Sequence, residues 1–330
     1  MNSLLVINVI SSFLVSSLSM YGALCLAWHY SFFDYADGAV KTHERPTPPV
    51  GGIAIFFSLC LISWFVEYNE CLVTLLTGSL AFLLLGVVDD LYPLYWYEKL
   101  MGQYIGVIIL LYKDIYGFMV ETYGWGYTAV VVVWFLAVIN GHNLIDVMDG
   151  LLAVTTIMSL LGLLFFNWYF YHLVVMKCIT IVLGTVLGFF LFNKPQASLY
   201  CGDAGALFLG SIIARLAWNL QYNWSLVACL LYDGAYTCGI QVLCAIFASL
   251  TIPSLIVSVS LVELFSLVCI RTYKGLAWYR PSKDHFALLL LKKGGTKNMI
   301  LGAVIFFSGV IIIMAFLLTI TLISYLKIKT

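Results

Sequence analysis

Long apolar runs separated by short polar segments recur along the whole chain. They cover residues 3–27, 52–66, 71–88, 101–112, 127–140, 151–168, 174–192, 205–219, 226–248, 252–270 and 299–325. A helix needs about 20 apolar residues to cross a bilayer. The pattern therefore predicts an all-α fold, a polytopic integral membrane helical bundle of about 10–11 transmembrane helices. Without repeats or a low-complexity linker, residues 1–330 are expected to form a single transmembrane domain.

The composition agrees with a membrane protein. Of the 330 residues, 63% are apolar and only 10% are charged, whereas soluble domains carry about a quarter charged residues. A formal net charge of zero gives no sign of nucleic-acid binding. The nine cysteines are scattered without metal-type spacing, which is typical of small buried apolar side chains rather than of disulfides or ligands. The first run lacks a basic start and a cleavage site, so we expect a retained span rather than a signal peptide.

Basic residues are distributed unevenly between the two sides. Eleven Lys and Arg residues fall in one set of alternate loops, and four fall in the opposite loops and the C-terminal tail. The richer set comprises the loops 28–50, 89–100, 141–150, 193–204 and 271–298. Because Lys and Arg favour the inner side, these loops are predicted to be cytoplasmic in the cell (inner) membrane, with both termini outside. The crossings between residues 225 and 271 must then be odd in number. Since two apolar runs lie there, one is expected to be broken, re-entrant or parallel to the surface.

Several carboxylates lie where an apolar run meets one of these loops. Asp89 and Asp90 directly follow one run, Asp146 and Asp149 lie between two others, and Asp203 precedes a fourth. Carboxylates at membrane depth are costly and tend to be functional, and adjacent carboxylates need a cation or a shared proton. Their oxygens favour a hard cation, and Mg²⁺ with few protein ligands usually shares its shell with substrate phosphates. The residues alone therefore predict metal-assisted phosphoryl chemistry at the cytoplasmic membrane surface, with solvated turns or helix caps as the alternative.

The motifs in these loops follow a defined order. A Pro- and Gly-rich segment covers residues 41–52, and residues 89–100 match the pattern DDxxxLxxxxKL. Residues 140–151 are similar to NxxNxxDGxDGL, and residues 202–210 to GDxGSxxLG. Residues 271–285 form the last segment. Together they resemble, over about residues 34–294, the polyprenyl-phosphate N-acetylhexosamine-1-phosphate transferases, which include phospho-MurNAc-pentapeptide translocase.

The chain departs from the family pattern at three places. Val147 replaces a glycine, Ala206 replaces a serine, and His285 stands alone where many bacterial members carry a HxHH cluster. The two small-residue changes need not remove a ligand, and the reduced histidine motif leaves the role of His285 open.

The resemblance implies transfer of a sugar-1-phosphate, most often N-acetylhexosamine-1-phosphate, from a UDP-sugar to a polyprenyl (undecaprenyl) phosphate, with release of UMP. This would be the first membrane step of a cell-surface polysaccharide such as O-antigen. Asp203 and Asn143 are the implied Mg²⁺ ligands, with Mn²⁺ as an alternative metal. The implied catalytic residues are Asp89, Asp90, Asp146 and His285. The implied substrate-binding residues are Lys41, His43, Lys99, Asn140, Asp149, Tyr200, Lys283 and Asp284.

The role of Asp89 is expected to be positioning of the lipid phosphate more than proton removal, because a phosphate monoester already has a second pKa of about 6. A covalent aspartyl intermediate is the competing mechanism. Lys99 is alternatively a brace for the aspartate pair, and Tyr200 an interfacial anchor rather than a uracil platform. Inside the apolar runs, a pair between Arg215 and Asp233 is an open possibility, and Glu263 could face the site.

Other functions are also compatible with parts of the pattern. Phospho-MurNAc-pentapeptide transfer in peptidoglycan synthesis is the alternative within the family. A membrane transporter would place charges inside the spans and break helices in paired halves, whereas here the charges gather at one face. A catalytically inactive homologue would lack Asp203 or the Asp89-Asp90 pair, and both are present. The donor sugar, the pathway and a homodimer remain open.

Overall fold

The computed structural model describes residues 2–33, 46–66, 69–220, 249–280 and 282–329. Within these ranges the regular elements are helices, as the apolar runs predict. They are α1 (Asn2–His29), α2 (Gly51–Ser63), α3 (Glu70–Leu91), α4 (Trp96–Leu110), α5 (Tyr112–Asp114), a π-helical segment (Ile115–Tyr123), α6 (Gly124–Ile145), α7 (Leu151–Tyr169), α8 (Leu173–Asn193), α9 (Gly202–Trp218), a helical segment Ser249–Ile256, α12 (Ser258–Tyr273), α13 (Phe286–Lys292) and α14 (Lys297–Lys329).

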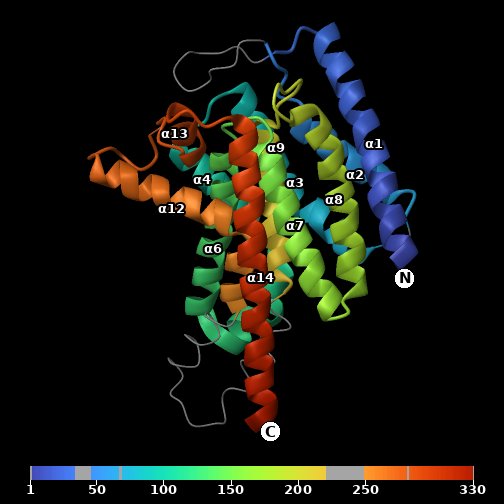
Figure 1. Cartoon of the computed structure of the whole chain (residues 1–330), viewed down its shortest axis with the longest axis vertical. Helices are drawn as coiled ribbons and strands as arrows, with labels where there is room; N and C mark the ends of the chain where they lie inside the picture. The colour runs from blue at the N-terminus through green and yellow to red at the C-terminus, as the bar shows by residue number, and fades with distance from the viewer. Residues whose placement is uncertain (1, 34–45, 67–68, 221–248, 281, 330) are drawn as a thin grey trace.

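The helices form one bundle around α9 (Figure 1). α9 packs against α2, α3, α6 and α7, while α1 packs on α8 and α14 packs on α7. Nearly every side chain of α9 is buried. Large apolar side chains cover the outward surfaces of α1 and α14, where Leu18 is 73% exposed and Phe306 is 65% exposed. Exposed apolar surface of this extent is typical of a lipid-facing surface, so the chain is a polytopic membrane protein.

Among the residues that the structure describes, six helices are long and apolar enough to cross a membrane, or up to seven if one bent pair counts as a single span. The predicted polytopic helical bundle is thus confirmed, and other described apolar runs form shorter helices. The runs at 52–66, 101–112 and 205–219 form α2, α4 and α9, of 13, 15 and 17 residues. At 1.5 Å per residue, helices of this length are roughly 20–26 Å long, so they cross a hydrocarbon core of about 30 Å only where the bilayer thins around them. The run at 226–248 lies outside the described residues.

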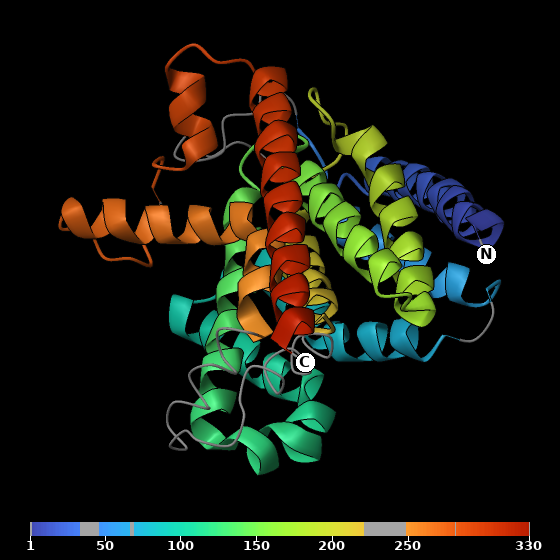
Figure 2. The same cartoon turned by 60° about the horizontal axis from the view of Figure 1, so that its bottom comes forward.

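The run at 252–270 is broken, which is one of the three outcomes that the charge distribution predicts. The helical segment Ser249–Ile256 and α12 are bent by 88° relative to each other. In both views α12 projects sideways from the bundle (Figures 1 and 2). Its end leads into the last loop, which returns through α13 to the start of α14.

Two glycines allow α2 to cross α9 at backbone contact. A Cβ on Gly52 would lie 2.2 Å from the backbone nitrogen of Gly205, and a Cβ on Gly205 would lie 2.6 Å from Cα of Gly52. A Cβ on Gly86 of α3 would likewise lie 2.3 Å from Cα of Ala204. Small residues at such crossings are the usual means by which membrane helices pack closely. The start of α9 is therefore enclosed by the starts or ends of its neighbours.

We expect Gly52→Ala to destabilise the protein by about 1–3 kcal/mol, because the added methyl group meets backbone atoms that cannot rotate away. The measurement is the melting temperature of the detergent-purified protein. Gly22→Ala in α1 is the matched control, since nothing lies within 4 Å of a Cβ at Gly22. Equal melting temperatures for the two variants would contradict the close crossing.

Candidate active site

The carboxylates predicted to act together meet at the start of α9. Asp89 and Asp90 lie in the last turn of α3, Lys99 lies in the first turn of α4, and Asn143 lies in the last turn of α6. Asp203 is the second residue of α9. Four helices thus bring their ends to one point, and each end follows or precedes an apolar run of the sequence.

Lys99 joins three of these side chains. Its Nζ lies 2.7 Å from Oδ2 of Asp89, 3.2 Å from Oδ1 of Asp203 and 3.2 Å from Oδ1 of Asn143. The amide of Asn143 also donates a hydrogen bond to Oδ1 of Asp203. The hypothesised brace holds for Asp89 of the aspartate pair, and its second carboxylate is Asp203 rather than Asp90. The ammonium group lies between oxygens that would otherwise repel one another. We call Asp89, Lys99, Asn143 and Asp203 the acid–lysine cluster.

Asp90 has a different task from its neighbour. Its Oδ1 accepts a hydrogen bond from the backbone N–H of Asp203 at 2.9 Å, and its Oδ2 accepts one from Ala204 at 3.0 Å. These N–H groups belong to the first turn of α9, where a carboxylate is favoured by the helix dipole. Gly202, with φ of +72°, permits this contact, since a Cβ there would lie 2.8 Å from Oδ2 of Asp90. Asp90 therefore fixes the position of Asp203.

Asp146 adds a further acid next to the cluster. It follows the end of α6, and burial, together with the charges of Asp203, Asp90 and Asp149, raises its pKa to about 7. Burial is the largest cause of this shift, and the neighbouring carboxylates add to it. A divalent cation bound nearby would favour the charged form of Asp146.

The donor atoms fit a hard divalent cation. Asp203 offers carboxylate oxygens on a side chain that is 35% exposed, and rotation of the Asn143 amide would turn its oxygen toward the same point. Among the described residues, no group of three His, Cys, Asp or Glu side chains is arranged to hold a metal. A metal here would take few protein ligands and complete its shell with water and phosphate oxygens, as Mg²⁺ commonly does.

Two predicted substrate-binding residues bind other parts of the protein. Asp149 Oδ2 accepts hydrogen bonds from the backbone N–H of Gln196 at 3.1 Å and from Lys297 Nζ at 2.6 Å. Asn140 pairs with the buried amide of Gln103, to which it donates at 2.6 Å. Asp149 thus joins three segments at this end of the bundle, and Asn140 joins α6 to α4. Their predicted contacts with substrate stay predictions.

The last loop is anchored in a similar way. His285 Nδ1 lies 2.8 Å from Oε1 of Glu263, and both side chains are buried. Asp284 pairs with Lys274, and Lys283 is exposed. The ring of Tyr279 stacks on Trp96 of α4 with 4.9 Å between centroids. His285 is therefore oriented by Glu263, a carboxylate that lies within the apolar run 252–270 of the sequence.

The first loop reaches the site through backbone contacts. The N–H of Tyr200 donates to the carbonyl of Pro48, and its own carbonyl accepts from Gly51, both at 2.9 Å. Tyr200 therefore lies beside the end of the Pro-rich segment. Lys41 and His43, which precede it, lie outside the described residues.

Other partners were not visible in the sequence pattern. Arg215 pairs with Asp114, with 2.6 Å between Nη1 and Oδ2. Asp233, its hypothesised partner, lies outside the described residues. Asn193 holds Gly150 N–H at 3.1 Å and the carbonyl of Leu199 at 3.1 Å. Asp114 and Asn193 could have been identified in the sequence as polar residues that follow an apolar run, which is how Asp89 was identified.

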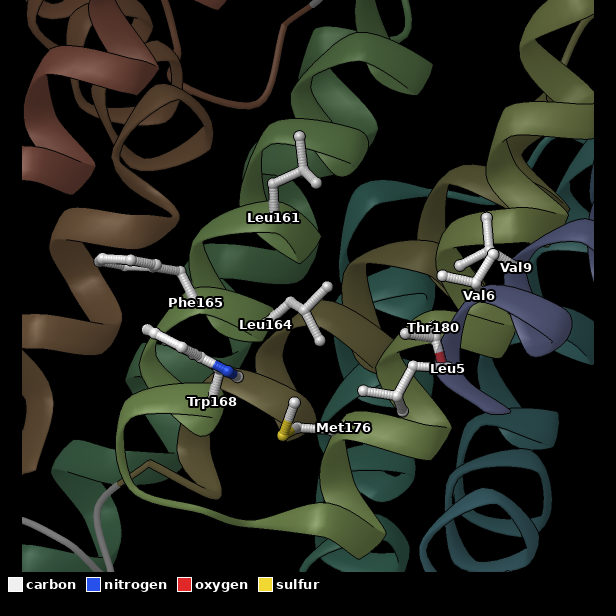
Figure 3. Close-up of a pocket in the computed structure, with 9 residues that line it drawn as sticks. All are labelled: Leu5, Val6, Val9, Leu161, Leu164, Phe165, Trp168, Met176 and Thr180. Atoms are coloured by element: carbon white, nitrogen blue, oxygen red, sulfur yellow. The ribbon is translucent and has the colours of Figure 1, made fainter. Parts of the chain in front are cut away.

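An apolar hollow elsewhere in the bundle is chemically unlike this site. It has a volume of about 350 Å³ and lies between α1, α7 and α8, lined by residues such as Leu5, Trp168 and Met176 (Figure 3). Thr180 is the polar residue among those drawn. Such a lining cannot hold phosphate or metal, so the acid–lysine cluster remains the candidate active site.

The fold and the site define a helical membrane protein with an oxygen-rich, lysine-braced centre at one end of its bundle. Residues 72–221 match the family model described as glycosyl transferase family 4. The matched segment contains the whole acid–lysine cluster, and the resemblance drawn from the motifs is thereby confirmed.

Individual relatives agree with the family match. The chain is 29% identical over 208 residues to a phospho-N-acetylmuramoyl-pentapeptide-transferase of Limosilactobacillus fermentum, covering 56% of this chain and 64% of the relative. It is 30% identical over 190 residues to a probable undecaprenyl-phosphate N-acetylglucosaminyl 1-phosphate transferase of Bacillus subtilis, covering 54% and 52%. The chain thus spans less than two thirds of the length of these relatives.

Proposed function

We propose that this protein transfers a sugar-1-phosphate from a UDP-sugar to a polyprenyl phosphate and releases UMP, in a cell-surface polysaccharide pathway such as that of O-antigen. The observation that carries the proposal is the acid–lysine cluster, where the ends of four helices meet at one end of the bundle. A phosphate carried by a lipid and a water-soluble nucleotide sugar can meet only at such a boundary. We infer that this end is cytoplasmic, because eleven basic residues of the sequence fall in its loops.

In the proposed reaction, Asp203 and Asn143 hold Mg²⁺, which would offset the charge of the diphosphate. Asp89 positions the attacking lipid phosphate together with Lys99. Both oxygens of Asp89 are engaged, one by Lys99 at 2.7 Å and the other by the N–H of Leu94 at 2.8 Å. A donor on each oxygen lowers the nucleophilicity of Asp89, which supports direct attack by the lipid phosphate over a covalent intermediate.

The nucleotide and the sugar are assigned to the surrounding loops. We propose that Tyr200 and Asp146 lie on the nucleotide side, and that His285, held by Glu263, contacts a phosphate or the sugar. We propose that the last loop selects the N-acetylhexosamine, with GlcNAc as the first donor to test.

The second candidate is phospho-MurNAc-pentapeptide transfer, because several relatives carry that name. An assay separates the two. The purified full chain in lipid nanodiscs is given Mg²⁺, undecaprenyl phosphate and, in separate reactions, UDP-GlcNAc, UDP-GalNAc or UDP-MurNAc-pentapeptide.

We expect UMP and a lipid-linked sugar from a UDP-N-acetylhexosamine and neither from UDP-MurNAc-pentapeptide. Product from the pentapeptide donor alone would favour the second candidate. Release of no UMP from any donor would contradict both.

A further inference from the structure

Three aromatic side chains join the last loop to the start of α4. The ring of Tyr279 stacks on Trp96 with an interplanar angle of 16°, and Trp278 packs edge to face against Trp96 with 5.1 Å between centroids. Trp96 is the first residue of α4, whereas Trp278 and Tyr279 belong to the segment between α12 and α13 (Figure 1). We call these three residues the aromatic clasp.

The loop side of the clasp is held in place by the end of α12. Gly275, with φ of +66°, follows this helix, and the N–H of Leu276 donates to the carbonyl of Arg271 at 2.8 Å, which is a common helix ending. The buried side chain of Arg271 then donates from Nη1 to the carbonyl of Trp278 at 2.6 Å and from Nε to the hydroxyl of Ser282 at 3.2 Å. The loop therefore presents its aromatic rings from an ordered backbone.

Each side of the clasp is close to a residue of the proposed site. Lys99 of the acid–lysine cluster follows Trp96 by three residues in α4, so the two side chains are neighbours on one face of the helix. On the other side, His285 begins α13 and is held by Glu263 of α12 at 2.8 Å. The clasp thus links the helix that carries Lys99 to the loop that carries His285.

Aromatic side chains near a membrane surface are often independent interfacial anchors. Trp96 and Tyr279 are 42% and 48% exposed, so each buries more than half of its surface. Their rings belong to segments far apart in the sequence, whereas the neighbouring stack of Tyr95 on Tyr97 lies within one segment. An anchor needs no partner ring and no arginine behind it, so the arrangement favours a role for the contact itself.

We infer that the aromatic clasp is a positioning device for the sugar donor, which keeps the last loop and His285 at a fixed distance from Lys99. The inference rests on the proposed function, in which the last loop contacts the sugar or a phosphate of the donor. Loss of the clasp would leave the contacts within the acid–lysine cluster in place and release the loop. The expected consequence is weaker binding of the UDP-sugar with unchanged binding of the metal.

The first measurement does not depend on activity. Hydrogen–deuterium exchange of the full chain in lipid nanodiscs, followed by mass spectrometry, reports on the amides of residues 272–280. They should exchange faster in Trp96→Leu than in the wild-type protein, while the amides at the start of α9 should be unaffected. Trp96→Phe, which keeps an aromatic ring, should restore slow exchange. Unchanged exchange of the loop in Trp96→Leu would overturn the inference.

The second measurement is the kinetics of UMP release. Trp96→Leu is expected to raise KM for the UDP-sugar about 5–10-fold and to leave KM for undecaprenyl phosphate and the affinity for Mn²⁺ unchanged. Tyr279→Leu should raise the same KM in the wild-type background and add almost nothing to Trp96→Leu, because its partner ring is already absent. Tyr279→Phe, which keeps the stack, should behave as the wild-type protein.

A matched control and the contrary outcomes complete the test. Tyr104→Leu, at a position of α4 that is 51% exposed, should keep wild-type kinetics. Additive effects of Trp96→Leu and Tyr279→Leu, or a rise in KM for undecaprenyl phosphate alone, would overturn the inference. If Trp96→Leu fails to fold, Tyr279→Leu removes the stack from the loop side and supplies the same exchange and kinetic test. Absence of UMP release from the wild-type protein, with the exchange as expected, would count against the proposed function alone.

Discussion

Asp203→Asn is expected to abolish sugar-1-phosphate transfer, lowering kcat by about 10³-fold or more, because the lost charge belongs to the carboxylate assigned to the metal. The amide keeps the shape of the side chain and can still accept hydrogen bonds from Lys99 and Asn143, so packing is preserved. UMP release is measured over a range of Mg²⁺ concentrations, and Mn²⁺ binding is measured by electron paramagnetic resonance. Raising Mg²⁺ should not restore turnover, and the affinity for Mn²⁺ should fall.

The control for this variant is a carboxylate far from the cluster. Glu121 is an exposed residue of the π-helical segment, and Glu121→Gln makes the same chemical change without reaching the site. It should retain wild-type turnover. The melting temperature of Asp203→Asn should fall little, since a negative charge in the first turn of a helix contributes about 0.3–1 kcal/mol. Normal turnover in Asp203→Asn would remove Asp203 from the metal site.

The sequence pattern was sufficient for the main features of the site. Apolar runs locate the helices, and a charged residue at the end of a run is held near the membrane boundary. Asp89, Asn143 and Asp203 each occupy such an end, so their convergence follows once the loops lie on one side. A brace of the aspartate pair by Lys99 was also among the sequence hypotheses, and the contact at 2.7 Å confirms it for Asp89.

The features that depend on distances between helices could not be predicted in this way. The crossing at Gly52 and Gly205 and the capping of α9 by Asp90 are set by how closely the backbones approach. Arg215 pairs with Asp114, which in sequence is an ordinary polar residue beyond a span. Apolarity alone also does not separate a helix that is long enough to span from a shorter one packed inside the bundle, such as α2.

Lys99→Met is expected to lower kcat by about 10²–10³-fold and to change metal affinity in the direction opposite to Asp203→Asn. In the structure the ammonium lies 3.2 Å from Oδ1 of Asp203 and competes with a divalent cation for the same oxygens. Methionine keeps an unbranched side chain of similar length but carries no charge. The remaining carboxylates should then attract a cation more strongly, and Mn²⁺ binding is expected to tighten roughly tenfold.

The two variants together separate charge balance from metal ligation. A residue that held the metal would weaken Mn²⁺ binding when removed, as Asp203→Asn should, whereas a cation that balances the ligands should strengthen it. Turnover falls in both, because Lys99 also keeps Asp89 in position for the lipid phosphate. Lys113→Met, at an exposed position beyond the far end of α4, controls for the loss of a lysine and should change neither quantity. Weaker Mn²⁺ binding in Lys99→Met would show that the ammonium does not balance the charge of Asp203. Full activity would show that it does not hold Asp89 in position.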